Sequence, residues 1–352
     1  MTMPSRLTRS RLNDDATALT DGGPAGHVPV LLDKVLAALA PRPGGRYLDG
    51  TFGGGGHTRA ILGASAPDGV VLGLDADAAA IERGRTLAAE SGIGDRLRLA
   101  HANFAALGEV AEREGVLPLD GVLLDLGLSS FQLDEAERGF AFRLEGPLDM
   151  RFDRSRGPSA ADLVNALPAE ALADLLFRYG EEPKSRRIAA VIVREREREP
   201  ITTTTRLAEV VSAAVGGRRG ADTHPATRTF QALRIAVNGE LEVLERALEA
   251  AVHSLAPGGR LAVIAFHSLE DRIVKRFVAH EAAACVCPPG LPVCVCDHTP
   301  RLRKVSGRAV RPTAAEVAAN PRSRSAVLRV AERLPDDAQA PTAPTSYRGQ
   351  GR

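Results

Sequence analysis

The sequence has almost no net charge, no long hydrophobic run and few cysteines. Its 352 residues carry 45 Lys or Arg against 44 Asp or Glu, which gives a formal net charge of +1. A nucleic-acid surface must therefore come from local clusters of basic residues rather than from bulk charge. No apolar run approaches membrane-spanning length, and residues 1–11 lack the apolar core of a secretory signal. We expect a cytoplasmic protein with no membrane partner.

The four cysteines all fall in one short segment, as Cys285-Val286-Cys287 and Cys294-Val295-Cys296. Two such pairs can ligate zinc, although Cys-x-x-Cys is the usual spacing of zinc ligands. The other interpretation is a loop that carries oxidisable thiols. The sequence leaves zinc binding and redox activity open, and we assign no metal to the catalytic site.

The rest of the chain is arranged around a glycine-rich stretch at residues 46–62. An apolar run, Arg46 to Asp49, predicts a buried strand, four glycines at 53–56 predict a turn, and a helix begins near Thr58. A strand, glycine turn and helix in this order form the first unit of a nucleotide-binding α/β fold. Asp49 would repel a pyrophosphate, whereas it suits the ammonium and sulfonium groups of S-adenosylmethionine (SAM). This stretch favours SAM over NAD as the cofactor.

Three further strands are predicted at residues 69–75, 96–100 and 120–127, and polar or aromatic residues follow their ends. Asp75 lies where an acidic residue binds ribose hydroxyls, and capping the next helix is its alternative role. Phe104 is placed to stack on adenine or to pack in the core. Asp125 ends the fourth strand at the sheet edge where open α/β folds bind ligands.

The alternation of strands and helices stops after residue 133. Residues 134–233 read as helices and loops, and we expect them to form an inserted helical domain for substrate recognition. A long helix over residues 230–255 and a strand over 260–266 then resume the α/β core, which comprises residues 27–133 and 234–333. The last strand, at 325–330, is expected at a sheet edge. Residues 1–26 and 334–352 are expected to be disordered tails.

A basic segment precedes the last strand. Residues 301–324 carry seven Lys or Arg and one acidic residue, Glu316. Such clustering can contact an RNA phosphate backbone. A solvated surface without an RNA role is the alternative.

Several long motifs together resemble one known family. These motifs are His27 to Leu32, Asp49 to Gly53 with Gly55 to His57, Leu124 to Gly127 with Ser129 and Ser130, Gln132 to Asp134, Glu137 to Phe140, Gly146 to Arg151, Tyr179 to Glu182, His224 to Gln231 and Phe266 to Arg272. On them the chain resembles the bacterial 16S rRNA (cytosine(1402)-N(4))-methyltransferases, the RsmH or MraW family. The resemblance covers about residues 27–333.

The resemblance implies a fold, a reaction and a partner. The fold is a Rossmann-like methyltransferase core with a mostly parallel seven-stranded sheet and an inserted helical domain. The reaction is SAM-dependent N4-methylation of a decoding-centre cytosine in 16S rRNA of the small ribosomal subunit. The protein is expected to act as a monomer or homodimer. The resemblance assigns cofactor binding to Gly55, Gly56, His57, Asp75, Phe104, Asp125 and Gln132.

Methylation of cytosine N4 requires an aligned nitrogen and an acceptor for its protons, because the nitrogen lone pair is conjugated with the ring. Ser129 and Ser130 follow the fourth strand, and His267 and Glu270 follow the fifth. These four residues and Asp125 are the catalytic candidates. Capping of the following helices is the alternative role for the serines and for Glu270.

In the predicted insert, six residues are candidates to grip RNA, with packing as the alternative: Arg138, Arg151, Arg228, Phe140, Phe142 and Phe230.

Overall fold

The computed structural model describes residues 29–336 except 91–92, 218–223, 290, 292 and 306. The predicted tail at 1–26, and His27 and Val28 of the first motif, lie outside these residues. So does the predicted tail at 334–352, apart from its first three residues. Within the described residues, no helix is both long and apolar enough to cross a membrane.

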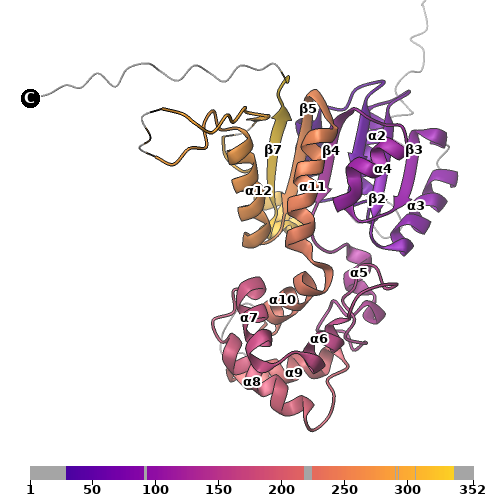
Figure 1. The fold of residues 1–352 in the computed structure, drawn as a ribbon. Coiled ribbons are helices and arrows are strands. Elements are labelled where there is room, and N and C mark those ends of the chain that lie inside the picture. Colours follow the sequence, from indigo (N-terminus) through magenta and orange to yellow (C-terminus); the bar gives the residue numbers. More distant parts are fainter. Residues whose placement is uncertain are drawn as a thin grey trace, which may run out of the picture.

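The core is a seven-stranded sheet whose strands run in the order β3-β2-β1-β4-β5-β7-β6 (Figure 1). The first five strands along the chain are parallel, and they pair β3 to β2, β2 to β1, β1 to β4 and β4 to β5. Their bounds are Arg46–Asp49 for β1, Val70–Asp75 for β2, Leu97–His101 for β3, Leu119–Asp125 for β4 and Leu255–Ala265 for β5. The expected α/β class and mostly parallel seven-stranded sheet are confirmed.

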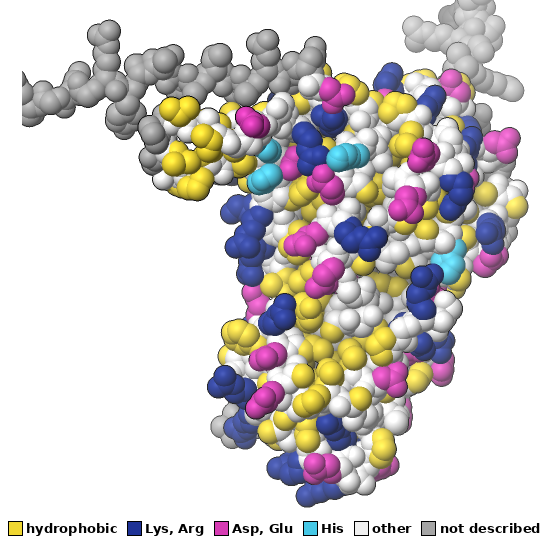
Figure 2. Space-filling model, in the orientation of Figure 1, with side chains coloured by type: hydrophobic (Ala, Val, Ile, Leu, Met, Phe, Trp, Pro, Cys, Tyr) yellow, Lys and Arg dark blue, Asp and Glu magenta, His cyan; other side chains and the backbone are white. Residues whose placement is uncertain are grey.

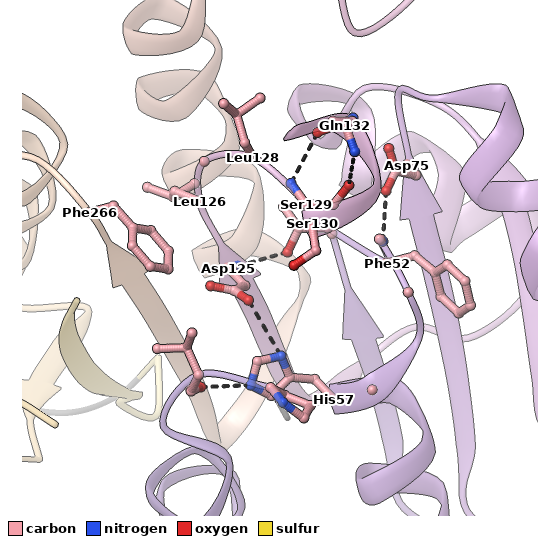
Figure 3. A pocket seen from close by; sticks show the side chains of 18 of the residues that line it. Phe52, His57, Asp75, Asp125, Leu126, Leu128, Ser129, Ser130, Gln132 and Phe266 are labelled. Atoms are coloured by element: carbon pink, nitrogen blue, oxygen red, sulfur yellow. Dashed lines mark hydrogen bonds and ion pairs between the residues drawn. The ribbon is translucent and has the colours of Figure 1, made fainter. Parts of the chain in front are cut away.

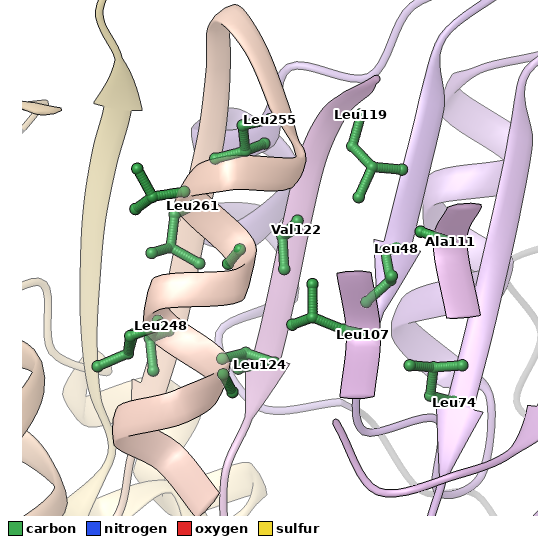
Figure 4. Close-up of a cluster of buried hydrophobic side chains, with 14 of the residues drawn as sticks. Leu48, Leu74, Leu107, Ala111, Leu119, Val122, Leu124, Leu248, Leu255 and Leu261 are labelled. Carbon is green, nitrogen blue, oxygen red and sulfur yellow. The ribbon is translucent and has the colours of Figure 1, made fainter. Parts of the chain in front are cut away.

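Alternate residues along the central strands enter two separate hydrophobic clusters. Leu48, Leu124 and Leu261 pack against helices α4 (Leu107–Arg113), α11 (Glu240–Ser254) and α12 (Ser268–Glu281) on one face (Figure 4). The neighbouring Tyr47 and Leu123 pack against α1 (Leu32–Leu39) and α2 (Gly56–Ala64) on the other face. Because helices cover both faces, these strands are apolar throughout rather than alternating with polar residues.

The C-terminal strands differ from the prediction. Strand β7 (Val327–Arg333) runs antiparallel between β5 and the short β6 (Leu302–Lys304). The expectation that the last strand lies at the edge was therefore wrong, because β6 covers it. β6 has only three residues, of which only Leu302 is buried, so it gives no recognisable strand pattern.

The predicted long helix over residues 230–255 is two helices. Helix α10 (Thr227–Asn238) ends at Gly239, whose φ of 58° is left-handed, and α11 begins at Glu240. Glycine adopts that conformation at little cost, so it permits a sharp change in chain direction. The helices on the two sides of this break pack in different hydrophobic clusters, α10 in one and α11 in another.

A third hydrophobic cluster lies within the helices that follow β4, seen below the sheet in Figure 1. It draws buried side chains from α6 (Ala160–Ala166), α7 (Ala169–Gly180), α8 (Ser185–Arg196), α9 (Thr204–Val215) and α10. We call these five helices the helical unit. The remaining helices are α3 (Ala78–Glu90), α5 (Ser130–Asp134) and α13 (Ala314–Ala319).

Candidate active site

A pocket opens at the carboxyl ends of β1, β2, β4 and β5 (Figure 3). The strand order reverses between β1 and β4, because the chain continues outward from β1 to β2 and β3 on one side and from β4 to β5 on the other. Open α/β sheets bind ligands at this switch point. The loop after β1 and the segment after β4 form facing walls, and Phe152, Glu240 and Arg322 add side chains from later in the chain.

Nine of the eleven predicted site residues line this pocket. They are Gly56, His57, Asp75, Phe104, Asp125, Ser129, Ser130, Gln132 and Glu270. Gly55 and His267 do not line it.

Gly55 has a structural role in the loop after β1. Its φ is 75°, and a Cβ at this position would lie 2.7 Å from the ring of Phe52. Any other residue would therefore strain the backbone and displace a buried aromatic ring. The structure thus gives Gly55 a structural role in this loop, and its assignment to cofactor binding stays a prediction.

Asp75 forms hydrogen bonds with the backbone around it. Its carboxylate accepts from Gly53 N at 2.8 Å and from Asp77 N at 2.8 Å. Asp77, not Asp75, caps α3, because its side chain accepts from Ala79 N at 3.1 Å. Burial raises the pKa of Asp75 to about 6. The capping alternative for Asp75 is therefore wrong, and Asp75 is one of the residues that line the pocket.

Asp125 carries a buried acceptor without a partner. Its Oδ2 lies 3.5 Å from Nδ1 of His57, whereas its Oδ1 is buried and has no hydrogen-bond partner. His57 Nε2 lies 3.0 Å from the carbonyl oxygen of Val30, which orients the ring. Burial raises the pKa of Asp125 to about 6, although the charge of His57 opposes this rise. A buried unpartnered carboxylate oxygen is costly, so it indicates a place for a ligand donor.

Ser129 and Gln132 form a capping box at the start of α5. Ser129 Oγ accepts from Gln132 N at 3.2 Å, and Gln132 Oε1 accepts from Ser129 N at 3.1 Å. Gln132 Nε2 also donates to Oδ2 of Asp77 at 3.3 Å. The capping alternative thus holds for Ser129. Ser130 lines the pocket as the first residue of the helix.

Glu270 and His267 form a similar capping box at α12. Glu270 Oε2 accepts from Phe266 N at 2.8 Å and from His267 N at 3.2 Å, and its Oε1 lies 3.1 Å from His267 Nε2. Burial acts to raise the pKa of Glu270, but His267 and Arg234 hold it below its ordinary value. Oε2 of Glu270 is therefore already engaged by two backbone N–H groups, and the His267 ring lies against Oε1, although its Nε2 makes no hydrogen bond.

Asp49 does not line the pocket, although its position next to the glycine turn suggested that it would. Its side chain is buried. Thr58 Oγ1 donates to it at 2.7 Å and Thr51 N at 3.1 Å. Asp49 thus fastens the glycine loop to α2, and the argument that it faces the cofactor directly was wrong.

Phe266 and Glu240 are among the pocket residues that the sequence did not single out. Arg234 holds Glu240 through two hydrogen bonds of 2.7 and 2.8 Å. Glu240 is one of several acidic residues in a helix, and only the break at Gly239 turns it toward the pocket. Phe266 directly follows β5, so its place at a strand end is a signal that could have identified it.

Three of the six candidates for gripping RNA are buried or held in place. Arg138 is buried, makes an ion pair with Asp77 and donates to the carbonyl oxygens of Arg151 and Phe152 at 3.1 Å each. Phe140 and Phe230 belong to the core of the helical unit. For these three residues the packing alternative is correct. Arg138 ties the chain entering the helical unit to the loop after β2.

The other three candidates are less buried. Arg151 pairs with Asp149 at 2.8 and 3.0 Å, and Phe142 is half-buried and stacks on His224 with ring centroids 4.5 Å apart. Arg228 is exposed and donates to the carbonyl oxygen of Glu181 at 3.1 Å. Exposure makes Arg228 the most accessible of the six.

The basic segment is partly neutralised by ion pairs. Arg301 pairs with Glu249 and Glu281, and Arg303 pairs with Glu332 at 2.6 Å. Lys304 and Arg308 are exposed. On the face seen in Figure 2, Lys and Arg side chains are interspersed with Asp and Glu rather than gathered in one broad patch.

The chain matches one family profile, and several known proteins that it resembles carry one name. The sequence profile of the MraW methylase family matches residues 24–334. A "Ribosomal RNA small subunit methyltransferase H" of Thermomicrobium roseum is 59% identical over 320 residues, which cover 91% of this chain and 97% of the relative. Proteins of the same name from Syntrophotalea carbinolica and Dehalococcoides mccartyi are each 52% identical over 310 residues. Both alignments cover 88% of this chain, and they cover 98% and 86% of the respective relatives.

Proposed function

The chain belongs to the MraW methylase family, and from this membership we propose that it methylates N4 of a decoding-centre cytosine, cytosine 1402, in 16S rRNA. The methyl donor is SAM. The substrate is the RNA within the small ribosomal subunit, which agrees with the expected cytoplasmic location. The oligomeric state of the protein, monomer or homodimer, stays a prediction.

One observation carries the proposal. Asp75 and Asp125 end two strands and Phe104 follows a third, yet all three line one pocket at the switch point of the sheet. Asp75 is assigned to the ribose hydroxyls, Phe104 to the adenine ring, and Gly56, His57 and Gln132 to the shape of the cofactor site. The anionic carboxylate of Asp125 fits a cofactor with cationic groups, which leaves its unpartnered Oδ1 for the substrate. SAM supplies an electrophilic methyl group at its sulfonium.

Asp125 is the best placed acceptor for the proton that leaves cytosine N4. The amine nitrogen is a weak nucleophile until its lone pair is turned out of conjugation and its proton is accepted. Asp125 Oδ1 has no hydrogen-bond partner, whereas Ser129 caps α5 and the Glu270 carboxylate already accepts from two backbone N–H groups and faces His267. Ser130 remains a candidate to hydrogen-bond the amine. His267 is assigned to orient Glu270, not to contact the base.

The helical unit and the chain leading into it are proposed to recognise RNA, with residues 134–233 as the inserted domain. A base inside folded RNA must be unstacked and held before its exocyclic amine can react. The helical unit has its own hydrophobic core, and its surface carries the exposed Arg178, Arg228 and Phe177, the last 62% exposed. Exposed aromatic and arginine side chains on one domain suit contact with unpaired bases and with phosphates.

Transfer of labelled methyl groups from SAM to assembled small subunits tests the function. The expected result is one methyl group per subunit, which mass mapping locates on N4 of a single cytosine. If the protein bound the subunit but transferred no label, a non-catalytic assembly factor would replace this proposal. Tight binding of NAD in calorimetry, with no binding of SAM, would instead support a dehydrogenase.

A further inference from the structure

The two ends of the loop between α12 and β6 are bonded to each other, but the loop has no hydrophobic core of its own. Arg301 N donates to the carbonyl oxygen of Glu281 at 2.9 Å, and the Arg301 side chain pairs with Glu281, so the two ends of the loop are fastened together. Between them, residues 282–300 contain no helix or strand at the positions the structure describes. We call these residues the cysteine loop. A loop of this length without secondary structure needs another source of order.

The hydrophobic residues of the cysteine loop do not supply that order. Val286, Val293 and Val295 are 38%, 70% and 72% exposed. Figure 2 shows hydrophobic side chains on the surface of this loop, where it projects from the body beside α12. Small units without a hydrophobic core are usually held by disulfides or by a metal ion.

The four cysteine sulfurs gather in the middle of this loop. Cys285, Cys287, Cys294 and Cys296 each offer a sulfur, and all four sulfurs lie within 4.8 Å of one another. Four of the sulfur–sulfur distances are 3.4, 3.5, 3.9 and 3.9 Å. All four cysteines are free thiols rather than disulfides. Four sulfurs at the corners of so small a tetrahedron match a single ion, because a Zn–S bond of about 2.3 Å places its ligands about 3.8 Å apart.

Backbone groups of the same loop point at these sulfurs. Val286 N donates to Cys296 Sγ at 3.5 Å, and Val295 N donates to Cys287 Sγ at 3.4 Å. Each of these bonds crosses from one Cys-x-Cys pair to the other. Hydrogen bonds from N–H groups to ligand sulfurs are the outer contacts that orient thiolates around a metal.

We propose that Cys285, Cys287, Cys294 and Cys296 bind one zinc ion that holds the cysteine loop in its folded shape. Four thiolates around one ion form a closed structural site, since no position is left open for water or substrate. Iron–sulfur clusters fit less well, because they divide four cysteine ligands among two or four irons and spread the sulfurs further apart. None of the four cysteines lines the active-site pocket, so the ion is structural and not part of methyl transfer.

The first experiment measures metal in the full chain, purified under reducing conditions from zinc-supplemented medium. Elemental analysis should find one zinc per chain, and four thiols should react with Ellman's reagent only after the metal is removed. Exchange for Co²⁺ should give the intense visible absorption of a tetrahedral thiolate complex. Four reactive thiols with no metal, or a mass reduced by two disulfides, would overturn the proposal. Iron in place of zinc would overturn the choice of metal.

Matched variants connect the metal to these side chains. Cys287→Ser with Cys294→Ser should reduce bound zinc from one per chain to background and make the loop sensitive to protease. Val293→Ser, an exposed position in the same loop, should keep the full zinc content. SAM binding should be the same in all three proteins, because the pocket lies outside the loop. Zinc retained by the double-serine variant would place the ion elsewhere and refute the assignment.

Discussion

The sheet and the helical unit differ in how well the sequence predicts which residues lie in the functional site. In the sheet, polar residues singled out at strand ends, such as Asp75 and Asp125, do line the pocket. In the helical unit and the chain leading into it, residues singled out by type, such as Arg138 and Phe230, are buried in structural contacts. The ends of strands in a parallel sheet meet at one edge, whereas a residue in a loop or on a helix takes its place from packing that the local sequence does not reveal.

The largest expected effect is on the proposed proton acceptor. Asp125→Asn should lower kcat by about 10²- to 10⁴-fold, because the amide cannot accept the proton of cytosine N4. Single-turnover methylation of small subunits measures this loss. Asp120→Asn, at the other end of β4, is the matched control and should keep kcat near that of the unchanged protein. Equal rates for Asp125→Asn and the unchanged protein would remove Asp125 from catalysis.

The next effect distinguishes a structural arginine from an exposed one. Arg138→Ala leaves Asp77 buried without its cation, which should lower the free energy of unfolding by about 3–5 kcal/mol. Arg228→Ala, an exposed control, should change it by less than about 0.5 kcal/mol. Urea unfolding measures both. A stable Arg138→Ala protein that had lost only RNA binding would break the contrast between the sheet and the helical unit.

Removing the carboxylate assigned to the ribose should weaken cofactor binding. Asp75→Ala is expected to cost about 1–3 kcal/mol of SAM affinity, a factor of about 5 to 150 in Kd, because ribose hydroxyls would lose a buried partner. Calorimetry with SAM measures the change. An unaltered Kd would mean that Asp75 serves only the glycine loop through Gly53.

The pH dependence should report the same two carboxylates. Burial raises the pKa of both Asp75 and Asp125 to about 6, so both are protonated at pH 5 and ionised at pH 7. Since the ionised forms bind SAM and accept the proton, kcat/KM for SAM should rise between pH 5 and 7 with an apparent pKa near 6. Asp125→Asn should remove part of this rise from the residual activity. A flat profile from pH 5 to 7 would contradict the assignment.

The smallest effect concerns the basic segment. Neutralising the exposed Lys304 and Arg308 should weaken RNA binding modestly and lower the slope of log K against log salt by about 1 for each phosphate that no longer faces a cation. Arg303→Gln is the control, because its guanidinium already pairs with Glu332. If the double variant had the same salt slope as the unchanged protein, the segment would be a solvated surface only.

The sequence alone determined the parallel sheet, the glycine turn and the polar residues at strand ends. Apolar runs of five to seven residues with a glycine turn leave few alternatives, and strand ends must meet at one edge of a parallel sheet. The long motifs likewise identified the family, which the matched profile over residues 24–334 confirms.

Tertiary structure alone decided which of these residues face the ligand and which hold the fold. Asp49 and Asp125 both end central strands, but Thr58 and Thr51 engage Asp49, whereas one oxygen of Asp125 has no partner. Glu240 reaches the pocket only because Gly239 breaks the helix before it, and β7 lies inside the sheet only because β6 pairs with it. Each outcome depends on contacts between residues far apart in the chain, which no local pattern of residue types contains.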